Sequence, residues 1–469
     1  MTEFSTHQVP GAEHEHGTGV FRRELLQVGF LGAFGMFMGQ EAIASPVNRT
    51  RGLKAKSVIL VWMPGGPPQM HLWDLKPDSP GQCRGSSTPI ATTVPGMRFG
   101  HWLPKTAKAA HHLALVRTMT LNAEDENHIP GHQLLLSGID QRPATFKFFA
   151  TRNDWPSIGS VISALKPARN GRPTAIHLPV RIRFEGAPCP GETAGWMGSK
   201  YDPWLIERDP NEPKFTVPDL VPAAGMTVDR LRDRRQLLSD VDAYRKDLDR
   251  DLEARQLTEA QQKAFSLATS SDVRKAFDLS QETTAVRDRY GRHTFGQSLL
   301  LARRLAQAGV TFVQANMGGL NHWDFHDKEN VGLNREMPPF DQAYSALIED
   351  LNQRGMLDDT LVICMSEMGR NPVLGKPVTG SIDNGARADG RNHWQWCWTG
   401  VFAGGGVRGG NVIGESDEWA GFPNSKAYYP SDMGATIFSA LGIDPSSEVH
   451  DTQNRPVVIS KGSVMTELV

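Results

Sequence analysis

Histidine and carboxylate side chains recur in this sequence close to runs that are typical of buried strands. A single histidine or aspartate at a strand end usually forms a turn or a structural hydrogen bond. Here at least four separate strand ends carry an imidazole or a carboxylate, several of them in glycine-rich turns. Because both groups are ligands of divalent ions such as zinc or manganese, this recurrence favours a metal site. The candidate ligands are His71, Asp74, Asp324, His326, Glu367 and His393.

A metal held by these groups could activate water or a hydroxyl group and neutralise a tetrahedral phosphate or sulfate. The carboxyl ends of the strands in an open α/β sheet are the usual place for such a ligand. The six strands that we expect are Ser57–Trp62, Leu113–Val116, Ala175–Val180, Val310–Ala315, Thr360–Met365 and Gly400–Ala403.

Helical patterns alternate with these apolar runs, at Gly296–Ala308, Asp341–Arg354 and Asp432–Leu441. Ser431 is the expected N-cap of the last helix, and glycines 309 and 355 stand where helix C-caps are expected. Continuous apolar strands that alternate with helices predict an α/β fold, with a central, mostly parallel sheet covered by helices on both faces.

The segment Asp229–Arg289 differs from the rest because it is highly charged, poor in glycine and proline, and helical in period. We interpret residues 229–289 as a helical excursion from the α/β core, since no proline- or glycine-rich linker frames the segment. Residues 45–469 are therefore expected to form a single domain.

The composition is that of an ordinary soluble globular protein. The 469 residues include 22% charged residues and have a formal net charge of −2. This balance gives no reason to expect nucleic acid as a partner. The four cysteines have no CxxC spacing, so a structural zinc knuckle is not expected, although one disulfide would be compatible with an oxidising compartment.

The N-terminal residues 1–44 have the pattern of a twin-arginine export signal. The paired Arg22 and Arg23 precede an uncharged stretch, Val28–Gly39, and Ala42-Ile43-Ala44 offers a cleavage site. This apolar stretch is about a dozen residues long, whereas spanning a bilayer takes about 20. The alternative is an amphipathic first helix of the folded domain. We expect a mature chain that begins near Ser45, contains no transmembrane segment and works in the periplasm or cell envelope.

Several segments resemble the family called domain of unknown function 1501, which is similar in fold to the alkaline phosphatase and sulfatase superfamily. The resemblance covers nearly the whole mature chain. It is carried by "ILVWMPGGPPQMHLWDLKPDSP", "IPGHQLLLSG", "DWPSIGSVI", "FGQSLLLARRLAQAGVTFV", "WDFH", "LDDTLVICMSEMGRNP", "GRNHW", "FAGGGVRGGNVIGESD" and "SDMGATIFSALGID".

This resemblance implies a metal-dependent site in which Arg370 binds substrate oxygens. Sulfatases place a modified cysteine or serine before a helix that ends in Leu-Thr-Gly, and counting back from "LLLSG" puts His128 at that position. His128 is therefore the candidate nucleophile or base. We also expect it near a helix N-terminus, which would lower its pKa. The alternative is that His128 only caps the helix.

The sequence departs from the family pattern at His71, Asn371 and Asn392, where the family usually has Asp, Thr and Asp. Two hypotheses follow. The chain is an exported metal-dependent hydrolase of phosphate or sulfate esters with an altered site, which uses zinc, manganese or calcium. Alternatively, it is a non-catalytic exported binding or surface module that keeps the fold.

Overall fold

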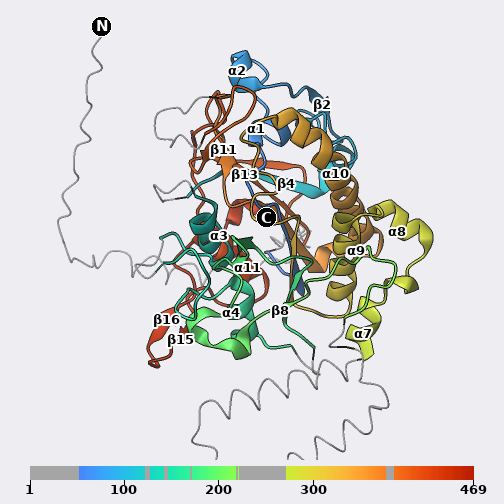
Figure 1. Ribbon diagram of the computed structural model, residues 1–469, viewed down its shortest axis with the longest axis vertical. Helices are drawn as coiled ribbons and strands as arrows, with labels where there is room; N and C mark the ends of the chain where they lie inside the picture. The colour runs from blue at the N-terminus through green and yellow to red at the C-terminus, as the bar shows by residue number, and fades with distance from the viewer. Residues whose placement is uncertain are drawn as a thin grey trace, which may run out of the picture. The chain divides into compact units, whose positions relative to one another are not determined.

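An eight-stranded sheet forms the centre of the molecule (Figure 1). The computed structural model describes residues 52–121, 127–141, 146–168, 172–217, 220, 271–375 and 385–469. In spatial order the strands are β14 (Asn411–Ile413), β4 (Leu113–Met119), β13 (Trp398–Ala403), β10 (Thr360–Met365), β1 (Ser57–Trp62), β9 (Phe312–Asn316), β5 (Ala175–Leu178) and β8 (Trp204–Leu205).

The sheet is mostly parallel, as predicted, and β13 runs against the other strands. It pairs antiparallel with β10 and β4, whereas β10, β1, β9, β5 and β8 pair in parallel with one another. Because β13 is reversed, the residues that precede it lie at the edge where the parallel strands end. A residue placed before β13 can therefore meet residues that follow the other strands.

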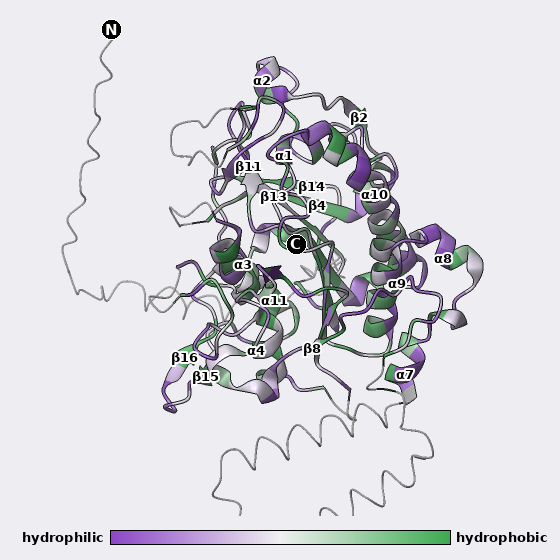
Figure 2. Ribbon diagram, in the orientation of Figure 1, coloured by the Kyte–Doolittle hydropathy of each residue, from purple (hydrophilic) through white to green (hydrophobic). Residues whose placement is uncertain are grey.

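Helices cover both faces of this sheet (Figure 1). One face packs against α9 (Thr294–Gln307) and α10 (Glu329–Gln353), and the other packs against α3 (His128–Ser137), α4 (Ile158–Leu165) and α11 (Pro430–Ala440). Side chains of β1 alternate between the two cores: Ile59 and Val61 join the first, and Val58, Leu60 and Trp62 join the second. Such double burial explains the continuous apolar run, since each buried Val or Leu contributes about 1.5–3 kcal/mol. Figure 2 shows this hydrophobic interior as green strands between mixed helices.

The observed elements match the six predicted strands and three predicted helices, and most of them differ from the prediction at their ends. β1 and β10 have the predicted bounds. The start predicted for α10 was wrong, since the helix begins at Glu329 and continues through Pro338 and Pro339. Glycines 309 and 355 follow α9 and α10 with φ of 89° and 65°, the left-handed conformation of helix ends.

The N-cap predicted for α11 was also wrong. The helix begins at Pro430, so Tyr429 is the N-cap, and the Tyr429 backbone N–H donates to Asp432 Oδ2 at 2.9 Å. Proline favours this first helical position because its missing N–H is one that no helical carbonyl would accept. Ser431 therefore lies inside the first turn, where its hydroxyl donates to Asp140 Oδ2 at 2.6 Å.

Shorter elements complete the described fold. The helical ones are α1 (Gln69–Leu72), α2 (Gly81–Arg84), η2 (Thr106–His112), η3 (Gly195–Met197), η4 (Ser199–Tyr201), η8 (Leu357–Asp359) and η9 (Thr466–Leu468). The strands form four pairs: β2 (Pro89–Ala91) with β3 (Arg98–Gly100), β6 (Arg183–Phe184) with β7 (Ala187–Pro188), β11 (Gly369–Arg370) with β12 (His393–Trp394), and β15 (Glu448–His450) with β16 (Pro456–Val458).

The described end of the predicted helical excursion is helical. It contains α7 (Ser271–Phe277), η7 (Leu279–Gln281) and α8 (Thr284–Tyr290), while residues 229–270 lie outside the described residues, as does the predicted export signal at 1–44. Within the described ranges, no helix combines the length and the apolar character that crossing a membrane requires. All four cysteines are buried and free, so the disulfide that the sequence allowed is not formed.

Candidate metal centre

Asp324 is the centre of a cluster of histidines at the edge where the parallel strands end. It follows β9, and its Oδ2 lies 3.1 Å from Nε2 of His128, at the start of α3. Its Oδ1 lies 2.9 Å from Nε2 of His326 and 3.4 Å from Nε2 of His393, which stands in β12 before the reversed β13. Three chain segments far apart in sequence therefore meet at one carboxylate, and the direction of β13 explains how His393 reaches it.

His128 is held between two carboxylates. Its Nδ1 lies 2.7 Å from Glu367 Oε1, and its Nε2 faces Asp324. Burial lowers the pKa of the imidazole, but hydrogen bonding and attraction to Asp324 and Glu367 outweigh it and raise the pKa to about 9. The lowering expected from the helix N-terminus was therefore wrong, because two carboxylates in contact exceed the effect of a helix dipole.

The Gly-Gly turn after β1 binds the carboxylate of Glu367. The backbone N–H of Gly65 donates to Glu367 Oε1 at 2.7 Å, and the Ser366 hydroxyl donates to Oε2 at 2.9 Å. Gly65 has a φ of 111°, and a Cβ there would lie 2.6 Å from the backbone nitrogen of Trp323. Attraction to His132 and hydrogen bonding to His128 hold the pKa of Glu367 low, although burial alone would raise it.

His132 also belongs to this neighbourhood, and it was not among the predicted site residues. The indole Nε1 of Trp62 donates to His132 Nδ1 at 3.0 Å, and His132 Nε2 lies 3.7 Å from Glu367 Oε1. Burial lowers the pKa of its imidazole to about 4. The signal in the sequence was its spacing, since residues four apart lie on the same face of a helix and His128 is the other member of the pair.

His326 and His393 lie at the more open side of the cluster. Their Nε2 atoms are 3.1 Å apart, and their side chains are 24% and 10% exposed. Burial, followed by repulsion from His128, lowers the pKa of His393 to about 4, which favours the neutral form that binds metals.

Arg370 orients the carboxylate of Asp324. It is fully buried, its Nη1 donates to Asp324 Oδ1 at 2.6 Å, and its Nη2 donates to the carbonyl of Arg391. A contact of this kind fixes the position of the carboxylate and keeps it ionised, as the strongly lowered pKa of Asp324 reflects. The predicted role of Arg370 in binding substrate oxygens stays a prediction.

His71 and Asp74 are not brought into this cluster. The turn after β1 leads into α1, where His71 Nε2 lies 3.0 Å from Glu329 Oε2. Asp74 Oδ1 pairs with Lys76 at 3.3 Å and Arg117 at 3.4 Å. Both side chains are thus engaged by other partners, and we leave them out of the metal site.

His128, Asp324 and His393 form a group of three side chains, within the described ranges, whose potential ligand atoms all lie within 4.8 Å of one another. His326 Nε2 adjoins this group, 2.9 Å from Asp324 Oδ1 and 3.1 Å from His393 Nε2. A tetrahedral zinc ion would hold such atoms about 3.3 Å apart, so a small inward movement would complete the site. His128 Nε2 is buried and lies 3.1 Å from Asp324 Oδ2, so the two atoms face each other across the point where a metal would sit. The donor set of two imidazoles and one carboxylate fits zinc or manganese. Glu367 contacts His128 Nδ1 and so takes the position of an orienting carboxylate instead of the ligand position that was predicted.

Three solved structures that are similar to this chain at low identity are an alkaline phosphatase, a lipoteichoic acid synthase and a sulfatase. The alkaline phosphatase from the Antarctic bacterium TAB5 is 13% identical, with a TM-score of 0.39, over 84% of this chain and 99% of that one. The lipoteichoic acid synthase LtaP from Listeria monocytogenes is 8% identical, with a TM-score of 0.40, over 88% of this chain and 75% of that one. The PsFucS1 sulfatase from Pseudoalteromonas sp. is 13% identical, with a TM-score of 0.33, over 83% and 68%.

No curated protein matches the chain. Residues 55–469 match the family described as "Protein of unknown function (DUF1501)", and this match spans the sheet, both helical layers and every residue of the Asp324 cluster. The chain therefore belongs to the DUF1501 family, as its motifs predicted.

Proposed function

We propose that this protein is an exported, metal-dependent hydrolase of phosphate or sulfate esters, whose metal is held by His128, Asp324 and His393. The observation that carries the proposal is the convergence of these three side chains on one partly exposed point at the carboxyl edge of the sheet. A divalent ion there would polarise an ester oxygen and offset the charge of a tetrahedral anion.

The surrounding residues have separate tasks in this proposal. Glu367 accepts a hydrogen bond from His128 Nδ1, which leaves Nε2 to bind the metal once the ion displaces the Nε2 proton. Arg370 holds Asp324 in its ionised form. His326 is the most exposed imidazole of the cluster, so it is the group placed to carry a proton between the site and water or a leaving oxygen.

Metal content and turnover together test the proposal. The protein is purified without chelators, its metal is measured by mass spectrometry, and zinc, manganese and calcium are titrated by calorimetry. Turnover is followed with aryl phosphate and aryl sulfate. We expect Asp324→Asn to lose metal binding and turnover together. Asp74→Asn is the matched control, because it removes a carboxylate that follows β1, as Asp324 follows β9, and that pairs with Lys76 and Arg117.

Each outcome of that comparison has a definite reading. Loss in Asp324→Asn with retention in Asp74→Asn supports the proposed ligand set. A wild-type protein that binds metal without turnover supports the binding or surface module instead. A wild-type protein that binds none of the three metals overturns the proposed metal centre.

Export rests on the N-terminal sequence and has its own test. We expect mass spectrometry of the protein from the exported fraction to find a start near Ser45. A double variant, Arg22→Lys with Arg23→Lys, should lose export, because this pathway reads the paired arginines. Unchanged export of the double variant would contradict the twin-arginine signal.

A further inference from the structure

Arg391 is a fully buried arginine two residues before His393, and its guanidinium contacts three separate chain segments. Its Nε lies 3.1 Å from Glu329 Oε2. Its Nη1 donates to the carbonyls of Asn371, at 3.0 Å, and Pro372, at 2.5 Å. Its Nη2 donates to the carbonyl of Cys83 at 3.2 Å. A planar guanidinium with five N–H groups in fixed directions is suited to acceptors spread in this way.

The backbone of Arg391 contacts the metal cluster through its nearest neighbours. Its N–H donates to the carbonyl of Phe325 at 3.1 Å, the residue between Asp324 and His326. Its own carbonyl accepts from Arg370 Nη2, and Arg370 in turn holds Asp324. Displacing Arg391 would therefore move the cluster from several sides at once.

Arg391 also closes the base of the segment that joins β11 to β12. The chain leaves the site at Arg370, returns at His393, and these two residues pair in the small β11–β12 sheet. The bonds from Nη1 to the carbonyls of Asn371 and Pro372, together with Asn371 N–H donating to the carbonyl of Asn392 at 2.9 Å, hold the outgoing and returning strands together. These hydrogen bonds therefore fix the separation between Arg370 and His393, two residues that both contact Asp324.

Glu329 anchors the guanidinium in turn. Its Oε2 lies 3.1 Å from Arg391 Nε and 3.0 Å from His71 Nε2. All three side chains are almost completely buried, where an ion pair is little screened by water and salt. The position of Arg391 is therefore fixed from α10 on one side and from α1 on the other.

We infer that Arg391 is a positioning residue for the metal centre: anchored by Glu329 and His71, it sets the distance between His393 and Asp324 without binding the metal. This inference rests on the proposed metal site. In this inference the cluster of His71, Glu329 and Arg391 supports the metal centre. Metal affinity then depends on the Arg391 guanidinium, which does not contact the metal.

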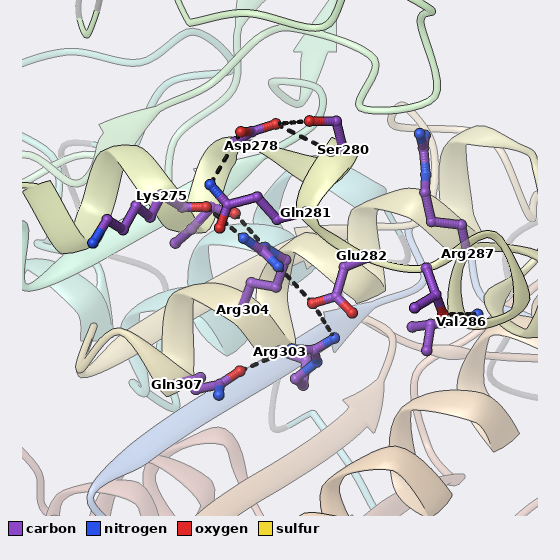
Figure 3. Close-up of polar contacts among 12 residues, drawn as sticks. Lys275, Asp278, Ser280, Gln281, Glu282, Val286, Arg287, Arg303, Arg304 and Gln307 are labelled. Carbon is purple, nitrogen blue, oxygen red and sulfur yellow. Dashed lines mark hydrogen bonds and ion pairs between the residues drawn. The ribbon is translucent and has the colours of Figure 1, made fainter.

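The test compares two buried arginines in the full chain. Arg391→Lys keeps the charge but removes the fork of donors. Arg303→Lys is the matched control, because Arg303 is also fully buried and ion-paired, with Glu282 at 2.8 Å and Asp350 at 2.9 Å. Figure 3 shows Arg303 between Glu282 and Gln307. Arg303 lies near the end of α9, which leads into the start of β9, so it is close to the edge of the sheet opposite the metal centre.

Zinc and manganese affinities by calorimetry and Tm by thermal unfolding are the two measurements. We expect both lysine variants to lose thermal stability. We expect only Arg391→Lys to lose metal affinity, by the about 10- to 100-fold that follows loss of an outer-shell partner. If Arg391→Lys does not fold, Glu329→Gln replaces it. The amide oxygen can still accept a hydrogen bond from Arg391 Nε, but the negative charge that holds the guanidinium is lost.

The outcomes separate the inference from the proposed function. If the wild type binds metal and Arg391→Lys or Glu329→Gln binds it with the same affinity, the positioning role is overturned and the metal centre stands. Loss of affinity in Arg303→Lys as well would also overturn it, since any buried arginine would then act alike. A wild-type protein that binds no metal overturns both.

Discussion

Two buried clusters, centred on carboxylates only five residues apart in sequence, differ in what supplies the positive charge. Asp324 is surrounded by three imidazoles, with Arg370 behind it. Glu329 is paired with one imidazole and with Arg391, whose remaining donors go to backbone carbonyls. An imidazole can lose its proton and bind a metal, whereas a guanidinium stays charged and leaves no ligand atom free.

The comparison teaches that residue types alone do not distinguish a metal centre from a structural ion pair. Both clusters combine histidine, carboxylate and arginine at the same edge of the sheet. The side chains of the Glu329 cluster are almost completely covered, while His326 in the Asp324 cluster is 24% exposed. We therefore expect the Glu329 cluster to govern stability and the Asp324 cluster to govern metal binding.

The largest effect is expected from Glu329→Ala. It leaves the buried guanidinium of Arg391 without its carboxylate, and breaking a buried pair in this way costs about 3–5 kcal/mol. Urea unfolding of the metal-free protein measures this loss. His393→Ala is the comparison variant and should lose much less, because its side chain lies at the open side of the Asp324 cluster. A greater loss of stability in His393→Ala would reverse the roles of the two clusters.

The pH dependence of stability should follow Glu329. Burial raises its pKa, but Arg391 and His71 lower it further, to about 2. Because this value is below the ordinary 4.5, the ionised carboxylate stabilises the fold above pH 4.5, and this stabilisation is lost as the pH falls towards 2. A shift of this size corresponds to about 3 kcal/mol. The difference in unfolding free energy between wild type and Glu329→Gln should therefore shrink from pH 5 to pH 3, and a constant difference would contradict the ion pair.

Metal affinity should respond to variants in the Asp324 cluster and not to variants of His71 in the Glu329 cluster. His393→Ala removes a proposed ligand, so zinc affinity should fall by more than about 100-fold, the upper range for loss of an outer-shell partner. His71→Asp restores the residue usual in the family but places an acid beside Glu329, so we expect lower stability and no gain in metal affinity. Tighter zinc binding by His71→Asp in calorimetry would return residue 71 to the metal site.

Ser366→Ala should have the smallest effect. The variant removes the hydroxyl that donates to Glu367 Oε2 at 2.9 Å and accepts from Gly66 N–H at 3.0 Å. A stability loss of about 1 kcal/mol is expected. Glu367 Oε1 keeps its contacts with Gly65 and His128, so metal affinity should stay at the wild-type value. A marked fall in affinity would show that Oε2 also orients the cluster.

Local sequence patterns were sufficient for the strands and for the edge at which the site forms. The apolar runs of β1 and β10 are buried on both faces, so their bounds could be read directly. Asp324, His326 and His393 could be found because they stand next to such runs. The wrong start for α10 came from Pro338 and Pro339, which usually mark a helix boundary.

Partners of the buried charges could not be predicted in the same way. His71 is paired with Glu329 across 258 residues, and no local pattern distinguishes that partner from Asp324. The direction of the His71 side chain depends on the Gly-Gly-Pro-Pro turn before α1. The pKa of His128 likewise depends on two carboxylates that only the folded chain brings to it.

The reversed strand β13 has a consequence for the order in which the chain can fold. Among the described residues, the strands that pair with β4, at residues 113–119, are β13 and β14, at residues 398–403 and 411–413. At about 5–20 residues per second, a ribosome takes on the order of tens of seconds to make the intervening chain. The apolar edge of β4, and α3 with His128 behind it, must therefore wait in the nascent polypeptide without their partners. This topology therefore leaves an apolar strand edge exposed to aggregation until the last quarter of the chain has been made.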